Sequence, residues 1–478
     1  MQEEKRIIKT DTGAKDGQNK CPKCGSTDIS TNVKKGLLRC NFCRHEFAGE
    51  KLECMVSDLK SLHGEILASG AKDIIAGTSD IVTFKCSSCG AEVVLNTSES
   101  LNARCHWCRN ILSQNEQIPN GAVPDVVLPF KIEKEEAKES IENFVGKRKF
   151  FAHPTFKKEF TTENIMGVYF PYMIIDVNAH SKLIGQGEHQ VRSYSVKEGD
   201  HYRTYYDADL YDIEREFDLV INGLTVESNI DRLNKQDKNK TNNIINSIMP
   251  FDTENCIKYN AHYLQGFSSE KRDTNTAELK DMVLIEAKDI ARFSANDTLK
   301  QYDRGVRWDS EELNVKGLQW TAAYLPVWLY SYQEKKGEKS ILHYVAVNAR
   351  TKETMGSVPI HMPKLIAVSI IVEILGIISM YYLSDFDYNW IFLFTGFVFF
   401  FIMYSRYRNA GARHRYETET EKSMSNLKAQ DRYITRRTRL SSSTMSGANN
   451  KIIQGENRKS KMVSDLLKQK EREENNDH

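Results

Sequence analysis

Long hydrophobic runs are missing from the first 360 residues, and the chain as a whole carries almost no net charge. Lys and Arg number 66 against 65 Asp and Glu. This balance gives no reason to expect a polyanionic partner for the whole chain. The N-terminal segment also lacks an apolar core. The sequence therefore predicts no secretory signal and a cytoplasmic location for residues 1–360.

The sequence also lacks the motifs of the common enzyme classes. It contains no G-x4-G-K-[ST] phosphate loop, no H-E-x-x-H zinc motif and no G-x-S-x-G nucleophile elbow. The histidines and aspartates between residues 180 and 209 have no metal-ligand spacing and are typical of solvated strand faces. We interpret the chain as a protein that is not an enzyme. A non-standard site within residues 128–362 is the alternative.

Two hydrophobic runs stand near the C-terminal end, at residues 365–383 and 390–405. As helices, each could cross an apolar layer of about 25–30 Å. The segment between them has no Lys or Arg, whereas Lys364 precedes the first run and four arginines follow the second. Basic flanks stay on the cytoplasmic side. The sequence thus predicts a two-span hairpin in the cell membrane with both termini in the cytoplasm. A buried hairpin in a soluble core is the alternative.

Glu373 lies near the middle of the first run, about 12 Å from Leu365 along a helix. An ionisable side chain at that depth is a candidate for function. We expect it to be neutral, or to pair with another subunit or another membrane protein. The second outcome would make the hairpin a site of oligomerisation. A neutral glutamate tolerated between helices is the alternative.

Eight of the ten cysteines form two quartets, each with the spacing C-x2-C-x15-C-x2-C: Cys21, Cys24, Cys40 and Cys43, then Cys86, Cys89, Cys105 and Cys108. Two thiolates separated by two residues can bind one ion from a tight turn, and 15 residues suit a β-hairpin that brings the second pair round. A closed set of four thiolates in a reducing compartment is typical of structural Zn²⁺. The chain is therefore expected to hold two structural zinc ions, while Cys54 and Cys256 are ordinary thiols.

The first zinc ribbon has a mildly basic surface that includes Lys34, Lys35 and Arg39. These side chains are candidates for phosphate contacts with a nucleic acid. No aromatic residues for base stacking alternate with them, so a solvated or protein-binding surface is the preferred interpretation.

The second quartet and the segment after it resemble a known family. The stretches that carry the resemblance are AEVV at 91–94, ARCHWCRN at 103–110 and QIPNGAVPDVVLPF at 117–130. They are similar to bacterial membrane proteins with TFIIB-type zinc ribbons, found in Gram-positive bacteria and sometimes labelled as replication or helicase proteins. The missing phosphate loop argues against a helicase. The resemblance runs from the second ribbon through the hairpin. It implies an inner-membrane setting beside membrane-stress scaffold proteins.

The middle region is expected to be an antiparallel α+β region with a diverged internal repeat, in units 128–222 and 260–360. YFPYM at 169–173 is echoed by YLPVW at 324–328. We interpret each as an edge strand, because proline cannot donate to a sheet ladder. A ligand groove between them is the alternative. Helices are predicted at 134–145 and 276–293, and strands at 190–196, 201–210, 214–221 and 341–349.

The sequence thus predicts a multidomain chain of two β zinc ribbons, an α+β region, a two-helix transmembrane hairpin and a basic tail attracted to anionic lipid. Its expected function is a membrane-anchored scaffold or adaptor that docks protein partners. A membrane-tethered nucleic-acid-binding protein is the alternative. The expected divisions are 1–19 disordered, 20–50 first ribbon, 51–84 helical connector, 85–115 second ribbon, 116–127 linker, 128–362 α+β region, 364–405 hairpin, and 406–478 disordered or helical tail.

Overall fold

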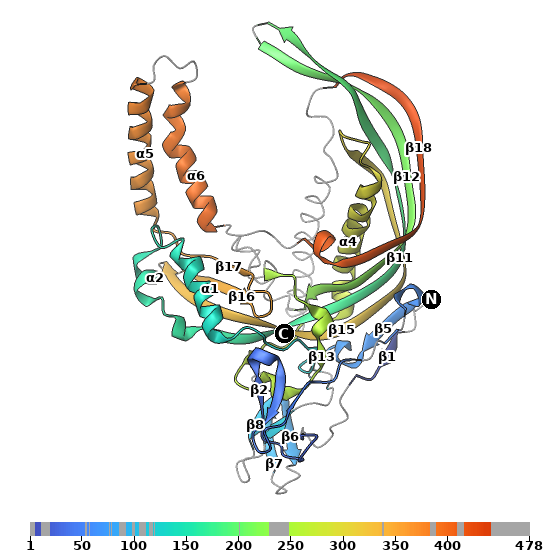
Figure 1. Cartoon of the computed structure of the whole chain (residues 1–478), viewed down its shortest axis with the longest axis vertical. Helices are drawn as coiled ribbons and strands as arrows, with labels where there is room; N and C mark the ends of the chain where they lie inside the picture. The colour runs from blue at the N-terminus through green and yellow to red at the C-terminus, as the bar shows by residue number, and fades with distance from the viewer. Residues whose placement is uncertain are drawn as a thin grey trace.

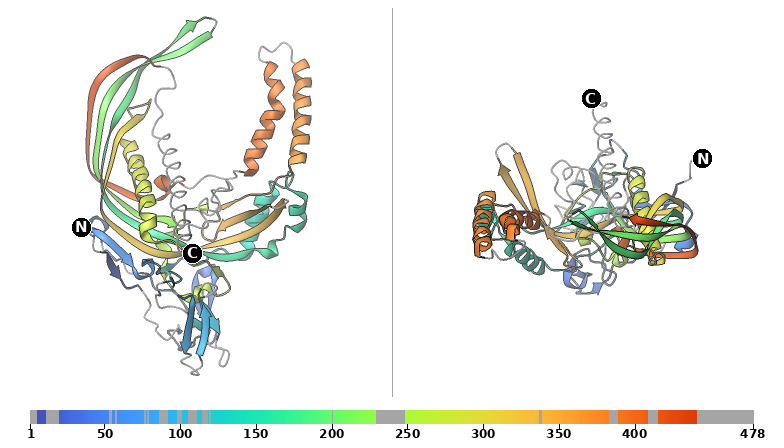
Figure 2. Two further views of the ribbon diagram at one scale, coloured as in Figure 1. Left: turned by 180° about the vertical axis from the view of Figure 1, so that it is seen from behind. Right: turned by 90° about the horizontal axis from the view of Figure 1, so that it is seen from above.

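The computed structural model describes most of the chain, with internal gaps. The described residues are 5–10, 20–52, 55–56, 58–75, 77, 79–85, 92–97, 101–104, 111–113, 118, 120–199, 201–228, 248–336, 339–382, 389–408 and 415–440. Figure 1 shows a curved sheet that rises on one side of the molecule and a helical hairpin that rises on the other, with small β-units below. Figure 2 shows the same arrangement from behind and from above.

Four long strands form the centre of the sheet. They are β11 (Met166–Glu198), β12 (His201–Glu227), β15 (Val306–Lys336) and β18 (Glu421–Leu440). A strand rises about 3.3 Å per residue, so the 33 residues of β11 follow a path on the order of 100 Å long. Within the described residues the sheet has 11 strands. Its main path runs β1-β5-β15-β11-β12-β18, and shorter strands pair along its margins.

Shorter strands complete this sheet: β1 (Arg6–Ile8), β5 (Gly64–Ala68), β10 (Val126–Val127), β13 (Ile257–Lys258), β14 (Ser268–Ser269), β16 (Lys339–Asn348) and β17 (Thr354–Gly356). The pairs β1–β5, β5–β15, β10–β15 and β11–β14 are parallel, and the other pairs are antiparallel. The α+β prediction is therefore confirmed, but the sheet is mixed rather than wholly antiparallel. The predicted strand segments fall in β11, β12 and β16.

Two helices that the sequence predicts are confirmed as α1 (Lys134–Gly146) and α4 (Thr276–Ala295). Each begins with a capping box; in α4 the Asn275 N–H donates to Glu278 Oε2 at 2.6 Å. The apolar face of α4 packs on the long strands through Leu279, Val283, Ala287, Ile290 and Ala291. Short helical segments are α2 (Pro154–Glu159), α7 (Tyr416–Glu419), η1 (Val33–Lys35), η2 (Leu59–Ser61), η3 (Ser69–Ala71), η4 (Thr162–Asn164), η6 (Thr253–Asn255), η7 (Ala261–Leu264) and η8 (Asn296–Thr298).

The two aromatic-proline segments lie on adjacent strands and pair with each other. Pro171 stands opposite Tyr324, and Tyr169 stands opposite Pro326. The edge-strand prediction is wrong, because β11 and β15 have neighbours on both sides. Each proline sits where the neighbour on one side changes, from β14 to β12 along β11 and from β10 to β16 along β15. No ladder donor is needed at such a junction. The internal duplication itself stays a prediction.

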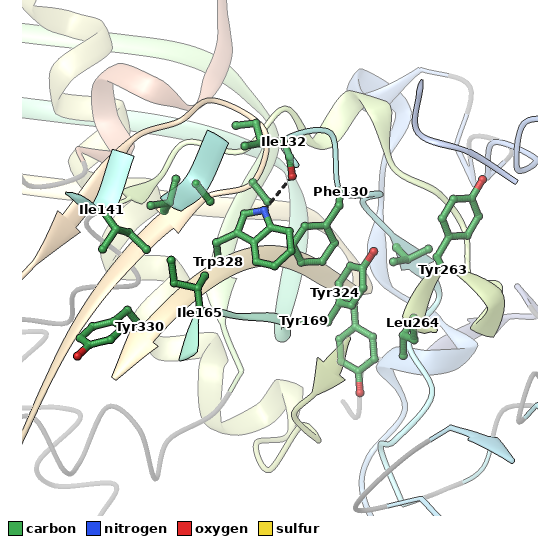
Figure 3. Packing of buried hydrophobic residues seen from close by; sticks show 14 of the residues in the cluster. Phe130, Ile132, Ile141, Ile165, Tyr169, Tyr263, Leu264, Tyr324, Trp328 and Tyr330 are labelled. Carbon is green, nitrogen blue, oxygen red and sulfur yellow. Dashed lines mark hydrogen bonds between the residues drawn. The ribbon is translucent and has the colours of Figure 1, made fainter. Parts of the chain in front are cut away.

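The aromatic side chains of these segments are packed in the core rather than arranged around a groove. Figure 3 shows Trp328, whose Nε1 donates to the Ile132 carbonyl at 2.8 Å. The Phe130 ring lies edge-on to Trp328 and to Tyr169, with centroids 5.1 and 5.0 Å apart. Aromatic pairs in this geometry stabilise a core beyond their buried area.

The helical connector predicted over 51–84 is not a helix in its described residues. Residues 59–71 form η2, β5 and η3, and β5 lies between β1 and β15 in the sheet. Gly64 adopts a φ of +69°, which does not fit a helix. Ile66 and Leu67 are both buried, so the strand is covered on both faces. Pairing within the sheet outweighs the helical spacing of the apolar residues.

The tail prediction is also wrong for residues 421–440, which form β18 along the outer edge of β12. Arg215 of β12 is 1% exposed, and its NH1 and NH2 atoms contact the two carboxylate oxygens of Asp431 at 2.5 and 3.1 Å. In the other direction, acidic side chains of β12 pair with cations of β18 that were expected to attract lipid. Further pairs are Lys428–Glu216 at 2.7 Å, Arg432–Asp212 at 2.8 Å and Arg436–Asp209 at 2.9 Å.

Candidate functional site

The first cysteine quartet forms a cluster at the end of a small sheet of β2 (Ile29–Asn32), β3 (Leu37–Cys40) and β4 (Glu46–Phe47). All four Sγ atoms lie within 4.8 Å of one another. The pairs Cys21–Cys43 and Cys24–Cys40 are each 3.6 Å apart. A tetrahedral site with Zn–S bonds of about 2.3 Å has sulfur–sulfur edges of about 3.8 Å. The cluster can therefore bind one metal ion.

Two matching turns bring the thiols together. The N–H of Gly25 donates to the Cys21 carbonyl at 2.8 Å, and the N–H of Arg44 donates to the Cys40 carbonyl at 3.0 Å. Gly25 and Arg44 both have positive φ, at 71° and 61°. The backbone N–H of Cys43 is the main cause that lowers the pKa of the Cys40 thiol to about 6. A lowered pKa favours the thiolate, which is the form that binds metal. Against the opposing backbone hydrogen bond of Ser26, burial and the neighbouring thiols raise the pKa of Cys24, so the four thiols do not ionise alike in the absence of an ion.

The second quartet, Cys86, Cys89, Cys105 and Cys108, lies outside the described residues. Two strand pairs around it are described: β6 (Ile81–Lys85) with β7 (Glu92–Asn96), and β8 (Asn102–Arg104) with β9 (Ile111–Ser113). Each cysteine pair falls in the connection between two paired strands. The second metal site stays a prediction.

The first ribbon is docked on the body of the protein. Thr31 Oγ1 donates to the His262 carbonyl at 3.0 Å, and the Gly49 N–H donates to the Tyr263 hydroxyl at 3.2 Å. Ile29 and Leu38 are almost fully buried and belong to the same apolar cluster as Tyr263. No local pattern in the sequence indicates this docking, because its contacts join residues more than 200 positions apart.

The candidate nucleic-acid contacts do not form a free basic surface. Lys35 Nζ lies 2.6 Å from Glu46 Oε2, so its charge is partly compensated. Arg39 is half-buried, and Lys34 is exposed. Of the three candidates, Lys34 is exposed and forms no ion pair with a described residue, although its charge interacts favourably with that of Glu136.

The two hydrophobic runs form the antiparallel helices α5 (Met362–Tyr382) and α6 (Thr395–Arg408), with η9 (Asn389–Phe394) before the second (Figure 1). Among the described residues, one helix, α5, is long and apolar enough to cross a membrane; its mean hydropathy is 2.1, and 17% of the span is buried. The second apolar helix is shorter. Seven large apolar side chains of α5 are exposed: Ile366, Ile370, Ile371, Ile374, Leu375, Ile377 and Ile378.

Glu373 has a partner within the hairpin. Its Oε2 accepts a hydrogen bond of 2.7 Å from the N–H of Gly396, in the first turn of α6. The first N–H groups of a helix have no partner in the helix, and a carboxylate there interacts favourably with the helix dipole. A Cβ at Gly376 would collide with Thr395, and one at Gly396 would collide with Ser369. These two glycines permit the close approach that the sequence analysis did not anticipate.

We expect Glu373→Leu to loosen the start of α6. Loss of a helix cap costs about 0.5–2 kcal/mol, which corresponds to a roughly 2- to 30-fold change in local opening. Amide hydrogen exchange at residues 395–397, measured in detergent by mass spectrometry, should accelerate by that factor. Glu373→Gln keeps an oxygen acceptor and should exchange at nearly the original rate. Equal exchange rates in the Leu variant and the original chain would contradict the capping role.

Two groups of residues were missed by the sequence analysis. One is Asp125, a fully buried carboxylate. The other is the run Lys147-Arg148-Lys149-Phe150-Phe151, which lies between α1 and α2. A basic run followed by two aromatic residues is a sequence signal for a membrane surface, and it could have been found in advance.

Comparisons with protein-family models, with curated proteins and with solved structures find no match to this chain. The resemblance described above therefore remains an expectation from the sequence.

Proposed function

We propose that the chain is a cytoplasm-facing scaffold, anchored in the cell membrane by the hairpin α5–α6, which docks protein partners through its zinc ribbons and sheet. The observation that carries this proposal is the exposed apolar surface of the hairpin. An apolar helix of a soluble core is mostly covered, whereas the apolar side chains of α5 are largely open to the surroundings. A patch of this kind marks a membrane or a partner.

The length of the second apolar segment supports a second span. Within the apolar run 390–405, five residues of η9 and 11 residues of α6 rise by about 2.0 and 1.5 Å each, or about 26 Å together, and the flanking residues of α6 extend the helix into the headgroup region. The apolar core of a bilayer is about 30 Å thick. The apolar side chains Phe394, Phe397, Val398, Phe401 and Ile402 are exposed along this segment.

Zinc is the metal that best fits the four thiols of the first ribbon, since Zn²⁺ accepts four thiolates in a closed tetrahedral site. Such an ion would stabilise the ribbon and would leave no open position for catalysis. The same spacing assigns a second ion to Cys86, Cys89, Cys105 and Cys108. The ribbons are then rigid surfaces on the side of the body away from the hairpin α5–α6, suited to docking proteins (Figure 1).

The direction of the long strands adds a condition to this proposal. Figures 1 and 2 show strands β11 and β12 rising from the body in the same direction as α5 and α6, on the opposite side of the molecule. The neighbouring strand β18 carries exposed charged side chains such as Arg432 and Arg436, which do not belong in an apolar layer. If a flat bilayer surrounds α5–α6, the helices α5 and α6 and the strands β11, β12 and β18 must therefore point in different directions in the inserted protein.

Single cysteines at three positions test the anchor. With a membrane-impermeant maleimide on intact cells, we expect Asp385→Cys to be labelled. Tyr202→Cys at the strand tip and His478→Cys should react only after permeabilisation. This pattern requires two spans with the body and C-terminal end on the cytoplasmic side. Labelling of only one of positions 202 and 478 in intact cells would indicate one span, and protection at 385 would overturn the anchor.

A further inference from the structure

The segment between α1 and α2 is attached to the base of the hairpin α5–α6. The Phe151 N–H donates to the Tyr407 hydroxyl at 3.1 Å, and the His361 N–H donates to the Phe151 carbonyl at 2.8 Å. Phe151, Leu365 and Tyr407 are buried together in a small apolar cluster. Figure 1 shows α1 and α2 beside the lower ends of both hairpin helices. The body is thus held at the end of the hairpin that the basic flanks assign to the cytoplasmic surface.

Five cations gather at this junction, which we call the basal cation cluster: Arg148, Lys149, Lys157, Lys364 and Arg406. Lys364 Nζ donates to the Phe150 carbonyl at 2.9 Å, and Lys157 Nζ donates to the same carbonyl at 3.4 Å. Partial desolvation, followed by the charges of Lys364 and Lys149, lowers the pKa of Lys157. Desolvation and then the charge of Arg406 lower the pKa of Arg148. Lys157 therefore lies close enough to Lys364 and Lys149 to be repelled by them, and Arg148 lies close enough to Arg406.

No carboxylate compensates the cluster within the described part of the chain. None of its five members forms an ion pair there, whereas the cations of β18 are paired with acids of β12. Like charges brought together without counter-charges are costly unless an anion binds. The cluster therefore has the electrostatic character of an anion-binding surface.

The exposed ring of Phe150 indicates which anion fits. It is 60% exposed, and Lys364 Nζ lies 3.8 Å from the centre of the ring. An exposed aromatic ring among cations, level with the end of two apolar helices, suits the boundary between headgroups and acyl chains. A soluble phosphate could bind to the cations but would make no apolar contact with the Phe150 ring.

We propose that the basal cation cluster binds the phosphate groups of anionic lipids in the leaflet next to the body, with Phe150 placed among the upper acyl chains. This inference rests on the proposed membrane anchor. It places the lipid contact at the segment between α1 and α2 rather than at the C-terminal tail, because the cations of β18 are paired with acids of β12. Lys364 and Arg406 come from the hairpin, whereas Arg148, Lys149 and Lys157 come from the body, so lipid binding would join the two parts.

The test compares full-length proteins by native mass spectrometry from micelles containing phosphatidylglycerol or phosphatidylcholine. The original chain should retain phosphatidylglycerol preferentially. A variant with Arg148→Glu, Lys149→Glu and Lys157→Glu should bind it at least 10-fold more weakly, since each cation near an anionic surface contributes several-fold. The matching Gln variant should lose part of the preference. The control variant carries Lys23→Glu, Lys60→Glu and Lys72→Glu. It reverses the same number of charges, at exposed residues away from the hairpin, and should keep the preference for phosphatidylglycerol.

Carbonate extraction of membranes separates failure of this inference from failure of the anchor. If all variants stay in the membrane and the original chain shows no preference for phosphatidylglycerol, the cluster is not a lipid site. If the original chain is itself extracted, the proposed anchor fails. Displacement of the lipid by millimolar inorganic phosphate would also overturn the inference, because a soluble anion would then satisfy the cluster.

Discussion

We expect Cys40→Ala to remove one bound metal ion per chain and to unfold the first ribbon. Cys40 is fully buried, and its Sγ lies 3.6 Å from that of Cys24. Structural zinc sites contribute about 10–16 kcal/mol to folding of a small ribbon, far more than its short strands could supply. Metal content should be measured by elemental analysis of the purified protein. Limited proteolysis should then cut within residues 20–48, and the same segment should resist cleavage in the original chain.

Cys256→Ala is the matched control. Cys256 is a free thiol whose pKa is raised by burial, and it lies outside the quartet. Its replacement should leave metal content and the protease pattern unchanged. Retention of the full metal content by Cys40→Ala would contradict a four-thiolate site.

Unfolding of the ribbon should also weaken its packing against the body of the protein and reduce the binding of partners. Ile29 and Leu38 leave the cluster that contains Tyr263, and the Thr31–His262 hydrogen bond is lost. If the ribbons dock partners as proposed, affinity purification from membranes should recover fewer proteins with Cys40→Ala, or with Cys105→Ser in the second ribbon. Unchanged recovery with both variants would remove the ribbons from partner binding.

The parts of the fold that the sequence predicts correctly are those encoded locally. The cysteine spacing predicts the first cluster because both halves of it lie within 23 residues. The helices α1 and α4 are predicted because their caps and apolar spacing lie inside the segments themselves. Glu373 is found by its depth in an apolar run. Local patterns of this kind are sufficient for helix caps, apolar helices and cysteine turns.

The errors arise where distant segments complement each other. The arginines of β18 match acids of β12 that lie about 200 residues earlier, so neither segment alone reveals the pairing. The strand β5 is short and pairs on its two edges with β1 and β15, and this pairing overrides its helical spacing. The partner of Glu373 depends on two glycines that let the helices approach. Cross-strand and interhelical contacts are tertiary properties, and a single sequence does not show which segments meet.

Asp125→Ala is expected to have a large effect on stability, because this residue joins three distant segments. Its Oδ1 accepts hydrogen bonds from the Gly70 N–H at 2.6 Å and from the Thr10 hydroxyl, and its Oδ2 accepts one from the Ala322 N–H at 2.8 Å. A Cβ at Gly70 would collide with Asp125, so the backbone approaches closely. Leaving two buried N–H groups without acceptors costs about 1–3 kcal/mol each. The free energy of unfolding should fall by about 3–5 kcal/mol, measured by denaturant titration in detergent.

Comparison with Asp125→Asn should reveal how the contribution of this carboxyl group to stability depends on pH. Burial raises the pKa of Asp125 to about 6, against the opposing effect of the Thr10, Gly70 and Ala322 hydrogen bonds. Because the pKa is higher in the folded state than in the unfolded state, its contribution to stability is largest below pH 4 and is lost as the pH rises through about 6. Asn does not titrate, so the stability gap between the original chain and Asp125→Asn should be about 1 kcal/mol wider at pH 5 than at pH 7.5. A gap that widens toward neutral pH would show instead that the carboxylate is held in its charged form by the three donors.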